Sequence, residues 1–310
     1  MALAAVQTDL NRRQWVDERK GDITLEEHAN AIAALRKNEL GVGTQKNNAG
    51  YLRNQLLPHF KNKRLRDITI RDVDTWWATV PTGAVNRRNA YFYLSSLMRY
   101  ALRYGYIQAS PCQVVAAGKD VAERRPAFTE ENFRAVVDRM PADLQVVAWV
   151  MYGAHLRIGE ACGLDYRHYN PMTGQVTVEQ QYTDSGGRSL RKTKTENVKT
   201  VTLGPTARTL LNAHVKEHPG LPRAPLFRGP RSPRLNLATF RREWNKARDA
   251  AGLPEFHPHD ARHTGLTKVA QKGGSTREVM ARGGHASVTA SLRYQHATRD
   301  RDVVLAEALG

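Results

Sequence analysis

The chain has 310 residues, of which 41% are hydrophobic and 25% are charged, and its formal net charge is +17. This length favours two domains over a single core, and the strong positive charge indicates a polyanionic partner, for which nucleic acid is the simplest candidate. The sequence has no apolar run of membrane-spanning length, no signal-peptide pattern and no basic amphipathic helix with a bulky apolar face. We therefore expect a cytoplasmic protein without membrane contact.

The first half of the chain has the pattern of a helical domain. Residues 1–22 are polar and of mixed charge, so we expect a short lead-in. Thr24 precedes Glu27 by three residues, which is the spacing of a capping box and predicts the start of a helix. Thr69 is a second predicted helix cap. We assign residues 23–112 to this helical domain.

A long helix is predicted after Gly83, and its charge has one sign. From Thr75 to Lys119 the sequence contains no Asp or Glu. Because a solvated helix usually carries both signs, we predict that the arginines of this segment contact DNA phosphates. They are Arg87, Arg88, Arg99 and Arg103. The aromatic residues of the same segment recur at mostly helical spacing, which favours packing in the core over stacking on bases.

Residues 113–125 show no strong periodicity and are assigned to a linker, so the second domain is predicted over residues 126–310. Two segments rich in β-branched residues, 175–181 and 198–203, are predicted strands with a basic hairpin between them. Helices are predicted at about 129–139, 142–153, 205–218, 236–251, 259–272, 275–283 and 286–294. The expected fold class is mainly α with a small antiparallel β-sheet.

The residues from His257 to Tyr294 carry groups suited to phosphodiester chemistry. Arg262 offers a planar fork for two phosphate oxygens, and His259 and His285 can donate hydrogen bonds or move protons near neutral pH. The hydroxyl of Tyr294 can become a covalent nucleophile. Neither a Gly-rich phosphate loop nor a carboxylate cluster lies nearby in the sequence, so we expect chemistry without a metal or another cofactor.

Two motifs resemble signature boxes of the tyrosine recombinases, the phage integrase family. H-D-A-R-H-T, then G-G-H-A-S, then Tyr294 nine residues after His285 is similar to the second box. A-H-L-R-I-G-E-A-C-G-L-D-Y, with Arg157 and Glu160, is similar to the first box. His155 stands where the family commonly has a small residue, and we assign it no role.

The family also has a lysine on a β-hairpin between the boxes. The segment R-K-T-K-T-E-N-V-K-T-V-T-L supplies it as Lys194, with Lys192 the alternative if the hairpin register slips by two. The segment T-Q-K-N-N-A-G-Y-L-R-N-Q-L-L-P-H-F is similar to the helical, SAM-like core-binding domain of phage integrases. The resemblance thus implies a core-binding domain followed by a mixed α/β catalytic domain.

The resemblance implies a site-specific recombinase that cuts and rejoins DNA through a 3′-phosphotyrosine intermediate and a Holliday junction, without metal or ATP. Tyr294 would attack the scissile phosphate, Lys194 would protonate the leaving 5′ oxygen, and Glu160 would orient an arginine. The implied catalytic set comprises Arg157, Lys194, His259, Arg262, His285 and Tyr294. Taken alone, Arg157 could instead be no more than an ion-pair partner of Glu160, and Lys194 part of a solvated charge run.

The same chemistry would fit a phage or mobile-element integrase or a Xer-type resolvase, and a type IB topoisomerase usually has different flanking domains. A non-catalytic DNA-binding regulator would suit the net charge, but the intact catalytic set speaks against it. The implied partners are double-stranded DNA attachment or core sites in a bacterial host, further copies of the chain in a tetramer, and accessory DNA-bending or directionality factors. The apolar face after Arg299 could pack on its own domain or on a neighbouring protomer.

Overall fold

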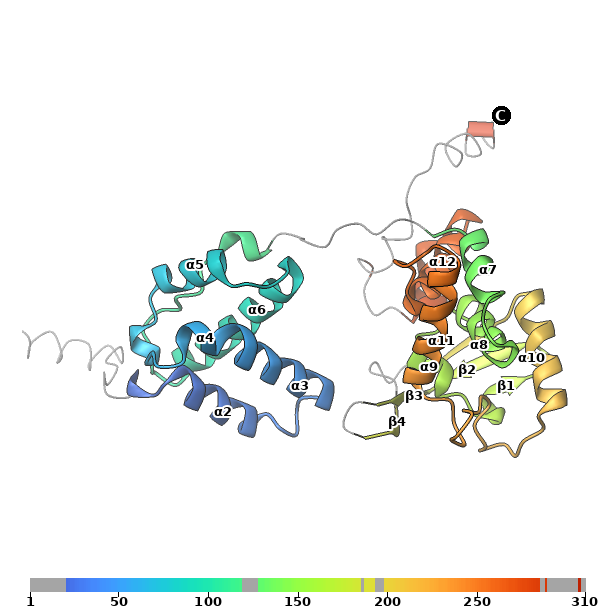
Figure 1. Cartoon of the computed structure of the whole chain (residues 1–310), viewed down its shortest axis with the longest axis horizontal. Helices are drawn as coiled ribbons and strands as arrows, with labels where there is room; N and C mark the ends of the chain where they lie inside the picture. Colours follow the sequence, from blue (N-terminus) through green and yellow to red (C-terminus); the bar gives the residue numbers. More distant parts are fainter. Residues whose placement is uncertain are drawn as a thin grey trace, which may run out of the picture. The chain divides into compact units, whose positions relative to one another are not determined.

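The computed structural model describes residues 21–118, 128–184, 187–192 and 198–284, together with residues 288 and 306–307. The chain divides into two compact units, Met1–Arg124 and Arg125–Gly310 (Figure 1). Within the described residues, no helix is long and apolar enough to cross a membrane.

The first unit is built from helices. They are α2 (Leu25–Leu35), α3 (Val42–Tyr51), a π-helical turn (Leu52–Leu56), α4 (Leu57–Phe60), α5 (Ile70–Thr79) and α6 (Ala84–Arg103). Both predicted caps are confirmed, because Thr24 forms a capping box with Glu27 and Thr69 forms one with Asp72.

Helix α6 supplies one face of the core of this unit. Its buried residues recur every three or four positions and include Leu94, Leu97 and Met98. The expectation that the aromatic residues of this segment pack in the core was wrong for Phe92 and for Tyr104 at the end of the helix, which are 46% and 39% exposed. Phe92 lies on the outer face of the helix, where the Arg88 guanidinium sits 5.3 Å from the centre of its ring.

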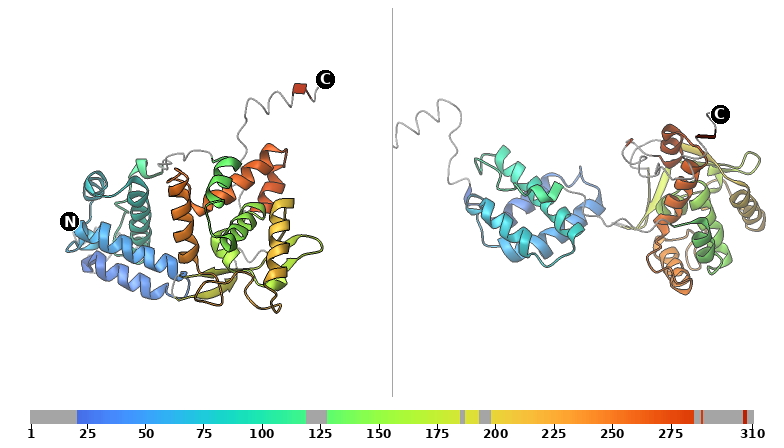
Figure 2. Two further views of the ribbon diagram at one scale, coloured as in Figure 1. Left: turned by 45° about the vertical axis from the view of Figure 1, so that its right-hand side comes forward. Right: turned by 90° about the horizontal axis from the view of Figure 1, so that it is seen from above.

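The second unit combines helices with small antiparallel sheets, of which the sequence predicted one and the structure has two. Its helices are α7 (Glu130–Val137), α8 (Ala142–Gly153), α9 (Ile158–Cys162), α10 (Pro205–Glu217), α11 (Leu237–Ala250), α12 (Pro258–Gln271) and α13 (Thr276–Gly283). The strands are β1 (Tyr169–Asn170), β2 (Gln175–Val178), β3 (Gln180–Thr183), β4 (Ser189–Lys192) and β5 (Lys199–Thr202). The buried helix α8 packs against both α10 and α12 (Figure 2).

The predicted strand over residues 175–181 is divided at Glu179. Strand β2 joins a sheet of order β1-β2-β5, with Val176 opposite Val201, whereas β3 pairs with β4. The Gln180 amide explains the division, because it donates to the carbonyl of Gly163 at 2.7 Å and to Asp165 Oδ2 at 3.0 Å. These bonds draw β3 away from β2 and toward the end of α9.

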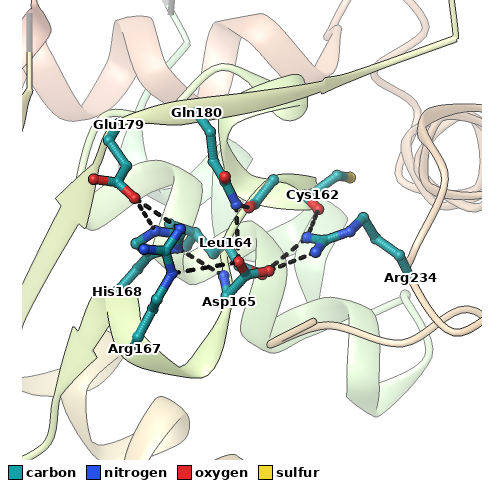
Figure 3. Close-up of polar contacts among 9 residues, drawn as sticks. Cys162, Leu164, Asp165, Arg167, His168, Glu179, Gln180 and Arg234 are labelled. Atoms are coloured by element: carbon teal, nitrogen blue, oxygen red, sulfur yellow. Dashed lines mark hydrogen bonds and ion pairs between the residues drawn. The ribbon is translucent and has the colours of Figure 1, made fainter. Parts of the chain in front are cut away.

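A buried polar network fixes the segment that follows α9 (Figure 3). Arg234 donates to Asp165 Oδ1 at 2.5 Å and to the carbonyls of Cys162 and Leu164 at 3.0 and 3.1 Å. Because the Asp165 carboxylate is buried, these donors offset the loss of its hydration. The network joins α9 and β3 to the loop before α11 and so anchors the segment that follows Glu160.

Trp244 on α11 fixes the loop that leads into α12. Its ring is fully buried against Phe240 and Phe256, and its Nε1 donates to the Phe256 carbonyl at 2.9 Å. Helix α12 begins two residues after Phe256 and carries two of the predicted site residues.

We expect Trp244→Phe to lower the free energy of unfolding by about 1–3 kcal/mol, because the buried Phe256 carbonyl would lose its donor. The exposed Lys246→Ala on the same helix should change stability by no more than about 0.5 kcal/mol. Denaturant unfolding measures both. Equal stability of Trp244→Phe and the parent would show that the indole hydrogen bond does not support the loop.

Candidate active site

The first part of the site is the turn between α8 and α9, where two hydrogen bonds join Arg157 to Glu160. Arg157 is the N-cap of α9, and its backbone N–H donates to Glu160 Oε2 at 2.9 Å. Its Nη1 donates to Glu160 Oε1 at 2.7 Å. The Arg157 side chain is 48% exposed, whereas the Glu160 side chain is only 6% exposed. Glu160 thus holds one edge of the guanidinium and leaves the rest open to a ligand.

Glu160 is an ionised carboxylate in a buried, cationic environment. Burial acts to raise the pKa of Glu160, but Lys199, the bonds from Arg157 and the charge of Arg262 outweigh it and hold the pKa below its usual value. Arg262 Nη1 lies 3.7 Å from Glu160 Oε2. One carboxylate therefore faces several cations, and the cluster keeps a net positive charge.

Arg262 lies on the floor of the site, on α12. Its side chain is 1% exposed. Its Nη1 donates to the His155 carbonyl at 2.7 Å, and its Nη2 donates to the Gly283 carbonyl. The arginine therefore joins the turn before α9 to the end of α13, and its fixed charge faces the same carboxylate as the exposed Arg157.

His259 is in the first turn of α12, and its side chain is exposed. Its ring meets that of His263 edge-on, with the ring centres 4.5 Å apart. Although the outer part of the ring reaches solvent, the protein around its inner part lowers the pKa of His259 to about 4 by partial desolvation, and His263, Arg262 and Arg157 add repulsion. At neutral pH the imidazole is therefore uncharged and can accept a proton.

Lys199 is a member of this cluster that the sequence analysis missed. Its Nζ donates to the carbonyls of Ala154, His155 and Arg282 at 3.4, 3.2 and 3.1 Å. Burial lowers the pKa of Lys199 to about 7, with Arg262, Arg157 and Arg282 adding to the effect and Glu160 opposing it. Strand alternation could have revealed it, because Lys199 shares a face of β5 with the buried Val201.

Of the six predicted catalytic residues, the structure describes Arg157, His259 and Arg262. It brings both arginines to Glu160, and it places His259 where their charges act on it. Lys194, His285 and Tyr294 lie outside the described residues, as do the residues of the predicted helix 286–294 other than Val288. The alternative hairpin lysine, Lys192, is exposed at the end of β4, opposite Gln180.

The four arginines predicted to contact DNA lie on α6 of the first unit and differ in their surroundings. Arg99 and Arg103 are exposed. Arg87 is half-buried over the Trp77 ring, 4.9 Å from its centre. Arg88 is also half-buried, and its Nε donates to the Ala117 carbonyl at 3.1 Å. Contacts within the protein therefore already engage Arg87 and Arg88.

Replacing Lys199 with Met should change how stability depends on pH. The unfolded chain binds more protons than the folded protein between pH 7 and the ordinary lysine pKa of about 10.4. In this window Lys199 makes the parent's free energy of unfolding rise with pH, by at most about 1.4 kcal/mol per unit. The variant lacks this rise, so the parent should gain stability relative to it from pH 7 to pH 9 in urea unfolding.

The exposed Lys192→Met is the matched control and should show the same pH dependence as the parent. Parallel pH curves for the parent and Lys199→Met would contradict the lowered pKa of Lys199.

Comparison with known proteins gives one consistent picture. Residues 127–301 match the model of the phage integrase family. The integrase of Mycobacterium phage L5 is 27% identical over 300 residues, covering 93% of this chain and 79% of that protein. The Tn1549 transposon integrase, solved with a circular intermediate DNA, superposes with a TM-score of 0.78 at 19% identity, covering 93% of this chain and 100% of that one.

A lambda integrase tetramer bound to a Holliday junction superposes with a TM-score of 0.70 at 19% identity, covering 87% of this chain and 79% of that one. At these identities the two solved structures show a shared fold.

Proposed function

We propose a way in which this chain, which belongs to the phage integrase family and is a site-specific tyrosine recombinase, binds its DNA substrate. The scissile phosphate would lie against the cluster formed by Arg157, Glu160 and Arg262. The observation that carries the proposal is a buried carboxylate, Glu160, that pairs with a half-exposed arginine, Arg157, and also faces a second, buried arginine, Arg262. Such preorganised positive charge stabilises the negative charge that develops on a phosphoryl group during displacement.

The two arginines would contribute differently. Arg157 has an accessible edge, so it would donate hydrogen bonds to the non-bridging oxygens. Arg262 already donates to two main-chain carbonyls, so it would act chiefly as a fixed charge close to the phosphate. The residual positive charge of the cluster after pairing with Glu160 favours an anion in this position.

Tyr294 would be the nucleophile. Its phenolic oxygen forms the new bond to phosphorus, the bond from phosphorus to the 5′ oxygen breaks, and the 3′ end stays attached to the tyrosine. His259, uncharged at neutral pH, would take the phenolic proton. Lys194 would protonate the departing 5′ oxygen, and His285 would donate a hydrogen bond to the phosphate. Attack by the 5′ hydroxyl of another strand reverses these steps, so no ATP is consumed.

The proposed DNA partners are double-stranded core or attachment sites of a phage or other mobile element. Arg99 and Arg103, which are exposed on α6, are the better candidates for phosphate contacts. Arg87 and Arg88 would first have to leave their contacts with Trp77 and Ala117. Recombination would take place in a tetramer of this chain on two DNA sites, with accessory DNA-bending and directionality factors as further partners in a bacterial cytoplasm.

A suicide substrate tests the proposed nucleophile. A nick close to the scissile phosphate makes the released strand, which carries the free 5′ hydroxyl, short enough to diffuse away. The covalent intermediate is then trapped because religation is no longer possible. We expect Tyr294→Phe to bind core-site DNA as the parent does and to form no covalent adduct, because it lacks the attacking hydroxyl. The adduct is measured on a denaturing gel, and DNA affinity by fluorescence anisotropy.

Tyr182→Phe, which removes the hydroxyl of a tyrosine on β3, is the control and should form the adduct at the parental rate. An adduct that persists in Tyr294→Phe would move the nucleophile elsewhere. A parent that binds core-site DNA without forming any adduct would instead favour a non-catalytic regulator.

A further inference from the structure

The backbone at His155 is unusual. Among the residues that the structure describes, His155 is the non-glycine residue with a positive φ, at 54°. L-amino acids with a β-carbon rarely adopt this left-handed conformation, which glycine adopts freely. His155 is also almost fully buried, at 3% exposure. The backbone strain at His155, two residues before Arg157, persists only if contacts of this residue stabilise the strained conformation.

The His155 side chain is bound by an arginine that lies 127 residues further along the chain. Arg282, in the last turn of α13, donates from Nε to His155 Nε2 at 3.0 Å. Its Nη2 donates to the carbonyls of Gly153 and Thr202 at 3.1 and 3.2 Å. One guanidinium thus joins the end of α8, the end of β5 and the end of α13.

The imidazole is uncharged and closely enclosed. Burial, together with the nearby positive charges of Arg282, Lys199 and Arg262, holds the pKa of His155 far below its ordinary value, at about 2. Because Nε2 accepts a hydrogen bond from Arg282, the ring proton is on Nδ1, which faces Gly265 of α12. A β-carbon at Gly265 would overlap the Tyr152 carbonyl oxygen and lie 2.8 Å from Nδ1, so the missing side chain makes room both for the backbone of α8 and for the ring.

The main chain of the same residue organises the site. The His155 carbonyl accepts from Arg262 Nη1 at 2.7 Å and from Lys199 Nζ at 3.2 Å. The direction of this carbonyl is set by the left-handed backbone. Rotation about φ at His155 would therefore move the acceptor of Arg262 and the start of the turn that carries Arg157.

We propose that His155 and Arg282 form a positioning pair for strand cleavage: the imidazole, held by the Arg282 guanidinium, locks the left-handed turn whose carbonyl orients Arg262. The inference rests on the proposed role of Arg262 and Arg157 in phosphate binding. A glycine at this position could adopt the same φ, but it would also adopt many others. The side chain supplies the restraint that glycine lacks.

Three variants separate positioning from backbone strain. His155→Gly removes the acceptor but fits the backbone, so relief of the left-handed strain offsets part of the cost of the cavity and of the unpaired Arg282 Nε. The variant should still unfold cooperatively and bind core-site DNA as the parent does. Its rate of adduct formation at saturating suicide substrate should fall by about ten- to a hundredfold, because misplacement of catalytic groups by about 1 Å has effects of this size. His155→Gln offers an amide oxygen near the position of Nε2 and should recover most of the rate.

Arg282→Met removes the other partner. If the two side chains act as one pair, His155→Gly should slow the Arg282→Met protein far less than it slows the parent. Arg277→Met, at an exposed position on the same helix, is the control and should cleave at the parental rate.

The proposal is overturned if His155→Gly cleaves as fast as the parent, because the side chain would then have no effect on the reaction. It is equally overturned if His155→Gln is no faster than His155→Gly, or if the effects of His155→Gly and Arg282→Met on the rate simply multiply. The function itself is judged separately, by adduct formation in the parent and its loss in Tyr294→Phe.

Discussion

The structure of the candidate site depends on one buried negative charge, the carboxylate of Glu160. It accepts hydrogen bonds from the backbone and the side chain of Arg157, and it faces Arg262 and Lys199. A buried carboxylate without such partners would be strongly unfavourable, and several buried cations without a carboxylate would repel one another. Glu160 therefore allows positive charge to accumulate at a position where a phosphate can neutralise the remainder.

The cationic groups around Glu160 come from three segments that are distant from one another in the sequence. The turn before α9 supplies Arg157, β5 supplies Lys199, and α12 supplies Arg262. Main-chain carbonyls at the ends of α8 and α13 tie these segments together by accepting from Lys199 and Arg262. Strand cleavage needs catalytic groups held to within a fraction of an ångström, and this density of cross-links is suited to that demand.

Sequence reasoning succeeded where the signal is local. The capping boxes at Thr24 and Thr69 lie within four residues, so the starts of α2 and α5 could be predicted. The signature motifs also singled out Arg157 and Arg262, which the structure brings to the same carboxylate, and their catalytic role stays a prediction. Sequence reasoning failed where a residue's structure or role depends on a partner that is distant in the sequence. The break at Glu179 depends on Gln180 bonding to the end of α9, and the role of Lys199 depends on carbonyls more than 40 residues away.

The most direct test of this account is the rate of covalent adduct formation by Glu160→Gln at saturating suicide substrate. The variant keeps the shape of the side chain but loses the negative charge that holds Arg157 near Arg262. The account predicts a rate about a hundredfold below that of the parent, with core-site affinity retained and with the exposed Glu217→Gln cleaving at the parental rate. A folded Glu160→Gln protein that cleaves as fast as the parent would contradict it.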